Sequence, residues 1–103
     1  MRLSICSIKE AYAKTGLKPI QKIWRDGKYA CPLNALCDAS GKPMPDTFAP
    51  EENWKHAARI LGLKVGEVRQ FIGGWDGLPK NKRLKSPEFR KLGERARKEI
   101  LGA

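Results

Sequence analysis

The sequence has no long hydrophobic run and few cysteines, and each shortage argues against a class of protein. A membrane-spanning helix needs about 18 consecutive apolar residues, and no segment approaches that length. The three cysteines are an odd and sparse set, which is typical of a reducing compartment rather than of a disulfide-stapled secreted domain. Lys9 and Glu10 interrupt the start of the chain before a signal-peptide core can form. We therefore expect a cytoplasmic protein with no membrane partner.

Residue types that carry catalysis or bind metals are equally scarce. The candidate zinc ligands are Cys6, Cys31, Cys37 and His56, and no two of them have a close ligand spacing. Neither standard phosphate-binding glycine loop is present, and no motif places a pair of carboxylates for acid–base chemistry. We expect no enzyme activity, no bound metal and no cofactor.

The cysteines near the middle of the chain have different predicted environments. Cys37 shares an apolar helix face with Leu33 and Leu36, which predicts a small buried hydrophobic residue. Cys31 lies at the start of the same predicted helix, where the helix N-terminus would lower its thiol pKa and make it reactive. A disulfide between them is not expected, because six residues of helix separate them by about 9 Å, beyond the bridging limit of about 7 Å.

Positive charge is what the sequence has in excess. Lysine and arginine number 21 against 11 acidic residues, which gives a formal net charge of +10. The excess is uneven, since residues 77–103 carry 9 basic and 3 acidic side chains while residues 1–76 carry 12 and 8. Such a balance favours an anionic partner, above all nucleic acid or an acidic protein.

Start and stop signals predict a mainly α-helical domain over residues 1–76. Ser7 and Glu10 have the spacing of a capping box, and Gly16 is a left-handed stop, so a helix is expected between them. Pro32 begins a second helix. The Asp-Gly dipeptide at 26–27 predicts a short β-hairpin over residues 20–31. The predicted core comprises Trp24, Leu33, Leu36, Trp54, Leu61, Leu63, Val68, Phe71 and Trp75.

The stretch 54–73 suggests both an architecture and a function. Apolar residues at helical spacing run from Trp54 to Leu61, with His56 off that stripe and expected to be exposed. Gly62 then allows a left-handed turn, and a second helix is expected from about Val65 to the glycines at 73 and 74. This arrangement resembles the helix-turn-helix pattern of DNA-binding proteins. The alternative is an ordinary helical hairpin that completes the core.

The helix-turn-helix resemblance implies that the second helix enters the major groove. The side chains expected to face the bases are Lys64, Arg69 and Gln70. Arg69 would pair with guanine and Gln70 with adenine, because these are the pairings that groove chemistry favours.

A basic linker over residues 77–85 and an amphipathic basic helix over residues 86–103 follow the domain. The linker cations are Lys80, Lys82, Arg83 and Lys85, and the helix cations are Arg90, Lys91, Arg95, Arg97 and Lys98. Together they would bind phosphates whatever the base sequence, with a strong dependence on salt. The alternative is a solvated helix that packs its apolar face on the core.

A second resemblance argues against base reading. Cys31-Pro32-Leu33, the Leu-Gly-Leu at 61–63 and the Trp-Asp-Gly at 75–77 resemble short bacterial proteins without an assigned function. Many of those proteins are acidic where this one is basic, which implies that any binding role lies in this chain's own charges. We expect a nucleic-acid-binding protein, with DNA favoured over RNA. The rival is a non-catalytic protein-interaction module whose basic helix docks on an acidic partner or on a second subunit.

Overall fold

The computed structural model describes residues 3–42, 50–78 and 87–102. Within these ranges the chain forms five α-helices and a small three-stranded sheet, which confirms a mainly α-helical fold with a short hairpin. The elements are α1 (Ile5–Thr15), β1 (Lys18–Pro19), β2 (Arg25–Asp26), β3 (Tyr29–Ala30), α2 (Pro32–Ala39), α3 (Pro50–Leu61), α4 (Val65–Asp76) and α5 (Pro87–Ala96), which continues as a π-helical turn, η1 (Arg97–Leu101).

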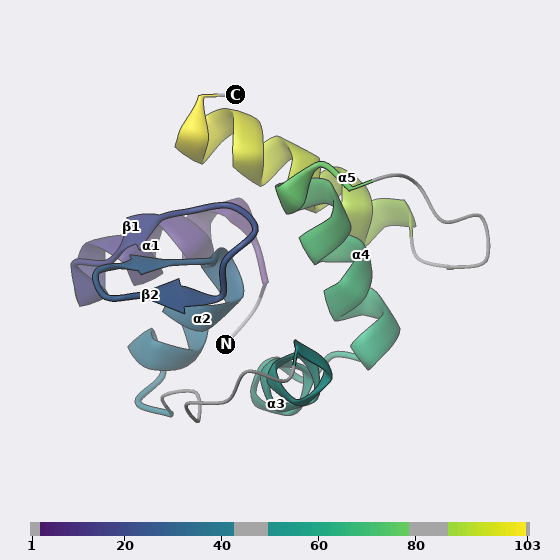
Figure 1. The fold of residues 1–103 in the computed structure, drawn as a ribbon, viewed down its shortest axis with the longest axis horizontal. Helices are drawn as coiled ribbons and strands as arrows, with labels where there is room; N and C mark the ends of the chain where they lie inside the picture. Colours follow the sequence, from purple (N-terminus) through teal and green to yellow (C-terminus); the bar gives the residue numbers. More distant parts are fainter. Residues whose placement is uncertain (1–2, 43–49, 79–86, 103) are drawn as a thin grey trace.

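The helices form two packed pairs joined by a bridging helix. α1 packs against α2, α4 packs against α5, and α3 contacts both α2 and α4 (Figure 1). The small sheet lies beside α1 and α2, with β3 in contact with α2. Buried side chains from both pairs form one hydrophobic core, so the arrangement is a single packed unit of helices.

The first helix begins earlier than the capping-box spacing predicts. Ser4, not Ser7, is the N-cap, and its hydroxyl accepts the Ser7 backbone N–H at 3.1 Å. The predicted stop is confirmed, since Gly16 has φ 74° and ends the helix. The Tyr12 hydroxyl donates to the Ala30 carbonyl oxygen at 2.7 Å, which ties α1 to the sheet.

The hairpin is confirmed, and a third strand joins it. β2 and β3 pair antiparallel with Asp26 opposite Tyr29, so that Gly27 and Lys28 form the two-residue turn. Gly27 has φ 56°, the left-handed conformation that glycine adopts readily at the first central position. β1 pairs parallel with β3 at the other edge, giving the order β1-β3-β2. A strand of two residues carries no alternating pattern, and the sequence therefore contains no signal for β1.

The predicted core is largely confirmed, with one omission. Six of its nine members are buried, namely Leu33, Leu36, Leu61, Val68, Phe71 and Trp75. Trp24, Trp54 and Leu63 are half-buried at its margin. The prediction omitted α1, which contributes Ile8, Ala11 and Tyr12.

The fourth helix continues through the glycines that were expected to end it. α4 runs past Gly73 and Gly74 to Asp76, and Gly77, with φ 71°, is the actual C-cap. The expectation of a stop at 73–74 is therefore wrong. A glycine pair inside a helix lowers its intrinsic stability, so the reason for these residues lies in what packs against them.

That reason is the close crossing of α4 and α5. A Cβ added at Gly74 would overlap the Arg90 backbone carbonyl oxygen, and one added at Gly93 would overlap the Phe71 carbonyl oxygen. The two helix backbones therefore touch directly, with a glycine from each helix at the crossing. Neither position has room for any other residue.

The C-terminal end of α4 is held by the segment before the hairpin. The Trp75 indole N–H donates to the Ile20 carbonyl oxygen at 2.9 Å, and the Gln21 amide donates to the Trp75 carbonyl oxygen at 2.6 Å. The Asp76 carboxylate accepts the Lys22 backbone N–H at 2.8 Å. Burial raises the pKa of the Asp76 carboxyl, and the Lys22 contacts oppose that rise. Lys22 adopts φ 63° to make this contact.

The crossing predicts how alanine substitutions affect stability. Gly74→Ala and Gly93→Ala should each lower the free energy of unfolding by about 1–3 kcal/mol or more, because a Cβ there forces two backbones apart. Gly66→Ala is the matched control, since it lies in α4 with no heavy atom within 4 Å of an added Cβ. It should raise stability by up to about 1 kcal/mol through helix propensity. Urea unfolding followed by circular dichroism measures all three, and wild-type stability in both crossing variants would contradict the crossing.

Candidate functional site

The connection between α3 and α4 has the predicted turn. The helices are joined by three residues, and Gly62 adopts φ 68°. The Leu63 backbone N–H donates to the Ala58 carbonyl oxygen at 2.8 Å, closing the end of α3. Ala58 is buried. The two helices are thus joined by a tight turn, and Figure 1 shows α3 nearly end-on while α4 runs across the view.

The exposure of α4 does not suit a helix that reads bases. Arg69 is the only one of its twelve residues that is exposed, and Gln70 is 7% exposed, so the expectation that Gln70 faces bases is wrong. Lys64 is exposed at the helix start, where its backbone N–H donates to the Glu67 carboxylate at 2.8 Å. α4 lies between α3 and α5 (Figure 1) and serves as the central packing helix.

An aromatic–cation contact occupies the outer junction of α3 and α4. The Arg69 guanidinium lies 5.4 Å from the centroid of the Trp54 ring, which keeps that half-buried ring partly covered. Lys55 and Arg59 are also exposed on α3, one turn apart. Neither is among the binding residues predicted from the sequence, although their positions off the apolar stripe of α3 are a readable signal.

The predicted cations of the last helix divide into two groups, and two of them turn inward. The Arg90 guanidinium donates to the Leu78 carbonyl oxygen at 2.6 Å and pairs with Glu94 at 3.1 Å, with 16% of its side chain exposed. Arg97 is half-buried, and its guanidinium lies against Gly77 at the C-terminal end of α4. Positive charge stabilises that end of a helix. These arginines hold α5 to α4 and are not available as phosphate contacts.

The other group faces solvent. Lys91, Arg95 and Lys98 are exposed and follow one another at helical spacing along α5 and η1. The linker cations lie outside the described residues, and these are Lys80, Lys82, Arg83 and Lys85. The structure thus retains three of the five helix cations as candidate binding residues.

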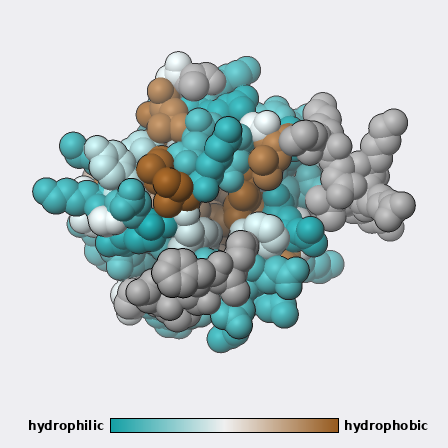
Figure 2. Space-filling model, viewed as in Figure 1, coloured by the Kyte–Doolittle hydropathy of each residue, from teal (hydrophilic) through white to brown (hydrophobic). Residues whose placement is uncertain are grey.

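Most of the positive charge in the described ranges is unpaired. Within those ranges, the ion pairs are Arg25 with Asp38 at 3.8 Å and Arg90 with Glu94 at 3.1 Å. The side-chain nitrogens of the remaining lysines and arginines in residues 3–42, 50–78 and 87–102 have no carboxylate oxygen of a described residue within 4 Å. Figure 2 shows a mostly hydrophilic face with small, separate hydrophobic patches. An unpaired cationic surface of this kind attracts anions.

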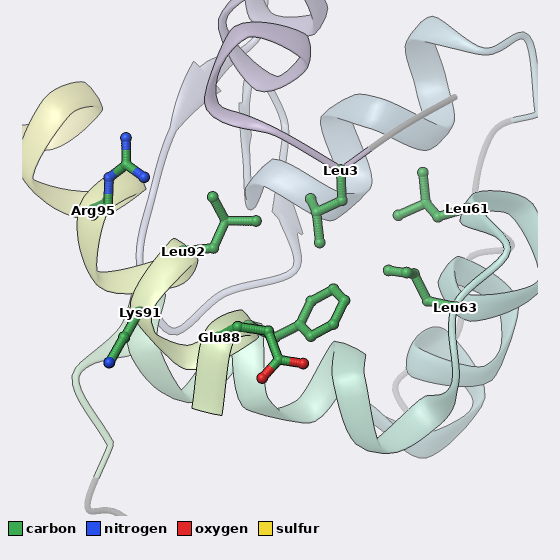
Figure 3. Close-up of a pocket in the computed structure, with 8 residues that line it drawn as sticks. Leu3, Leu61, Leu63, Glu88, Lys91, Leu92 and Arg95 are labelled. Atoms are coloured by element: carbon green, nitrogen blue, oxygen red, sulfur yellow. The ribbon is translucent and has the colours of Figure 1, made fainter. Parts of the chain in front are cut away.

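A groove of about 450 Å³ lies between α5, the α3–α4 connection and the N-terminal segment. Its apolar lining consists of Leu3, Leu61, Leu63, Phe89 and Leu92, and its charged lining is Glu88, Lys91 and Arg95. Figure 3 shows Leu3, Leu61, Leu63 and Leu92 directed toward a common space from opposite sides. No local sequence pattern signals this groove, because its walls come from three segments far apart in the chain.

The predictions for Cys37, Cys31 and His56 have different outcomes. Cys37 is fully buried, as predicted. Cys31 is the N-cap of α2, but burial raises its thiol pKa to about 12 even though the backbone N–H groups of Leu33 and Asn34 favour the thiolate. The expectation of a lowered pKa is therefore wrong, because desolvation outweighs the helix terminus. His56 is half-buried rather than exposed, and its Nε2 is buried without a hydrogen-bond partner.

Among the described residues, no group of three or more histidine, cysteine, aspartate or glutamate side chains is placed to hold a metal ion. No helix in the same part of the chain is long and apolar enough to cross a membrane.

No protein-family model, curated protein or solved structure matches this chain.

Burial predicts which thiols react. Iodoacetamide at pH 8 should modify exposed Cys6 and leave Cys31 and Cys37 unmodified, because both are buried with thiol pKa values raised to about 12. Intact mass should show one adduct on the folded protein and three after unfolding in guanidinium. Rapid modification of Cys31 in the folded protein would contradict its burial.

Proposed function

We propose that this protein binds nucleic acid without reading its sequence, through contacts to the phosphate backbone. The observation that carries the proposal is the set of exposed cations on α3, α4 and α5 that have no ion-pair partner among the described residues. Unpaired lysine and arginine side chains gain most from phosphate, since they release the counterions condensed on the nucleic acid. Duplex DNA is the form we favour.

Two groups of cations supply the contacts. The first lies on α3, the α3–α4 connection and α4, and consists of Lys55, Arg59, Lys64 and Arg69. The second lies on the last helix and consists of Lys91, Arg95 and Lys98. Phosphate contacts position a protein on nucleic acid, whereas base contacts provide specificity. With Gln70 buried and α4 covered, the available side chains are those of the positioning type.

The proposed role is non-catalytic, in line with the scarcity of catalytic groups in the sequence. The rival role, a protein-interaction module whose basic helix meets an acidic partner or a second subunit, is favoured by a different observation, the apolar groove beside Lys91 and Arg95.

The proposal predicts a strong dependence of affinity on salt. Binding of the full chain to a fluorescein-labelled random duplex should weaken as potassium chloride rises, with a log–log slope of about −0.9 for each phosphate neutralised. A slope of about −4 or steeper, unchanged between duplexes of different sequence, is the expected result. Absence of binding at low salt overturns the proposal.

Paired charge removals should locate the surface. The double variants Lys55→Gln/Arg59→Gln and Lys91→Gln/Arg95→Gln should each make the salt slope shallower by about 2, because each loses two phosphate contacts. The matched control is Lys9→Gln/Lys42→Gln, which removes the same charge from exposed positions on and after the α1–α2 pair. If the control weakens binding as much as either test variant, the contacts are diffuse and the proposed surface is wrong.

A further inference from the structure

The groove between α5 and the α3–α4 connection has a chemistry that phosphate binding does not use. Five apolar side chains from three segments line it, which are Leu3, Leu61, Leu63, Phe89 and Leu92. Three of them, Leu63, Phe89 and Leu92, are only half-buried. An apolar groove rimmed by polar residues is typical of a site that receives another apolar surface.

The rim of the groove has a definite charge pattern. Lys91 and Arg95 line it, are exposed, and have no carboxylate within 4 Å among the residues described. Glu88 lines the groove seven residues before Arg95 on the same helix, so about 10 Å separates the negative and positive ends of the α5 rim.

This combination selects the class of occupant. An amphipathic helix lays apolar residues at i, i+3 or i+4 and i+7 into such a groove and keeps polar side chains at the rim. The cationic rim favours carboxylates on the flanking positions of that helix, because charge complementarity steers and orients the partner. Glu88 disfavours a carboxylate at its own end of the groove.

We propose that this groove is the docking site for an acidic amphipathic helix of a partner protein. Its leucine-type anchors contact the five apolar side chains, and its aspartate or glutamate residues meet Lys91 and Arg95. The end of the helix nearest Glu88 carries a neutral or basic residue. The inference does not rest on nucleic-acid binding, although both use Lys91 and Arg95.

The test uses the full chain and a designed peptide probe. The probe is a helical peptide with leucines at i, i+3, i+4 and i+7 and glutamates on the flanking positions, and a second probe has lysines in place of the glutamates. Titration with the glutamate peptide should shift the methyl resonances of Leu3, Leu63 and Leu92 in NMR spectra. No shift at millimolar peptide, or an equal response to the lysine peptide, overturns the proposal.

A charge swap separates the rim contacts from general charge effects. Lys91→Glu/Arg95→Glu should weaken the glutamate peptide by about tenfold or more and should gain affinity for the lysine peptide. Both side chains are exposed and have no ion-pair partner in the part of the chain that the structure describes, so the fold should tolerate the change. The matched control is Lys9→Glu/Lys42→Glu, which reverses the same charge at exposed positions outside the groove and should leave the affinity for the glutamate peptide within about twofold. Weakening by this control as large as that of the test variant overturns the assignment of the rim.

Two other occupants would give different results. Methyl shifts that depend on protein concentration without peptide, together with a dimer in sedimentation, would mean that a second copy of this chain fills the groove. Shifts of the same methyl groups on addition of duplex DNA alone would mean that nucleic acid occupies it. Either result overturns the peptide proposal.

Discussion

The crossing of α4 and α5 is the contact on which the rest of the structure depends. Gly74 and Gly93 bring the two helix backbones together at a distance that excludes any side chain. The crossing sets where α5 lies, and Arg90 and Arg97 reinforce it at the C-terminal end of α4. The groove and the exposed cations of α5 follow from that placement, because a helix held further from α4 would not bring Phe89 and Leu92 to the Leu61–Leu63 wall.

α4 is largely used for packing in this fold, since it contacts α3 and α5 and six of its residues are buried. A helix that contacts α3 and α5 and is anchored by the segment before the hairpin has little surface left for a ligand. Most of the proposed binding residues therefore lie on α3 and α5, where the cations are exposed. Cations on one helix nevertheless have opposite roles: Arg90 satisfies a backbone carbonyl, whereas Lys91, its neighbour, faces solvent.

The two proposed ligands share part of one surface. Lys91 and Arg95 belong both to the cation set and to the groove rim. A peptide whose carboxylates neutralise these side chains removes two phosphate contacts, each of which contributes to a salt-dependent affinity. An acidic helix and nucleic acid would then compete for the protein, which would couple partner binding to release from nucleic acid through direct competition.

The sequence by itself determined the local elements and the total charge. Gly16, Pro32 and Gly62 mark helix boundaries because backbone geometry at a terminus is a local property, and the apolar spacing from Trp54 to Leu61 identifies a packed face in the same way. Only the tertiary structure decided what those elements meet. The glycines at 73 and 74 look like a helix stop until α5 is placed against them. Cys31 looks reactive until its burial is known, because desolvation depends on residues distant in the chain. The burial of Gln70 and the shape of the groove are of the same kind. Each depends on how several segments pack together, so no single segment of the sequence signals it.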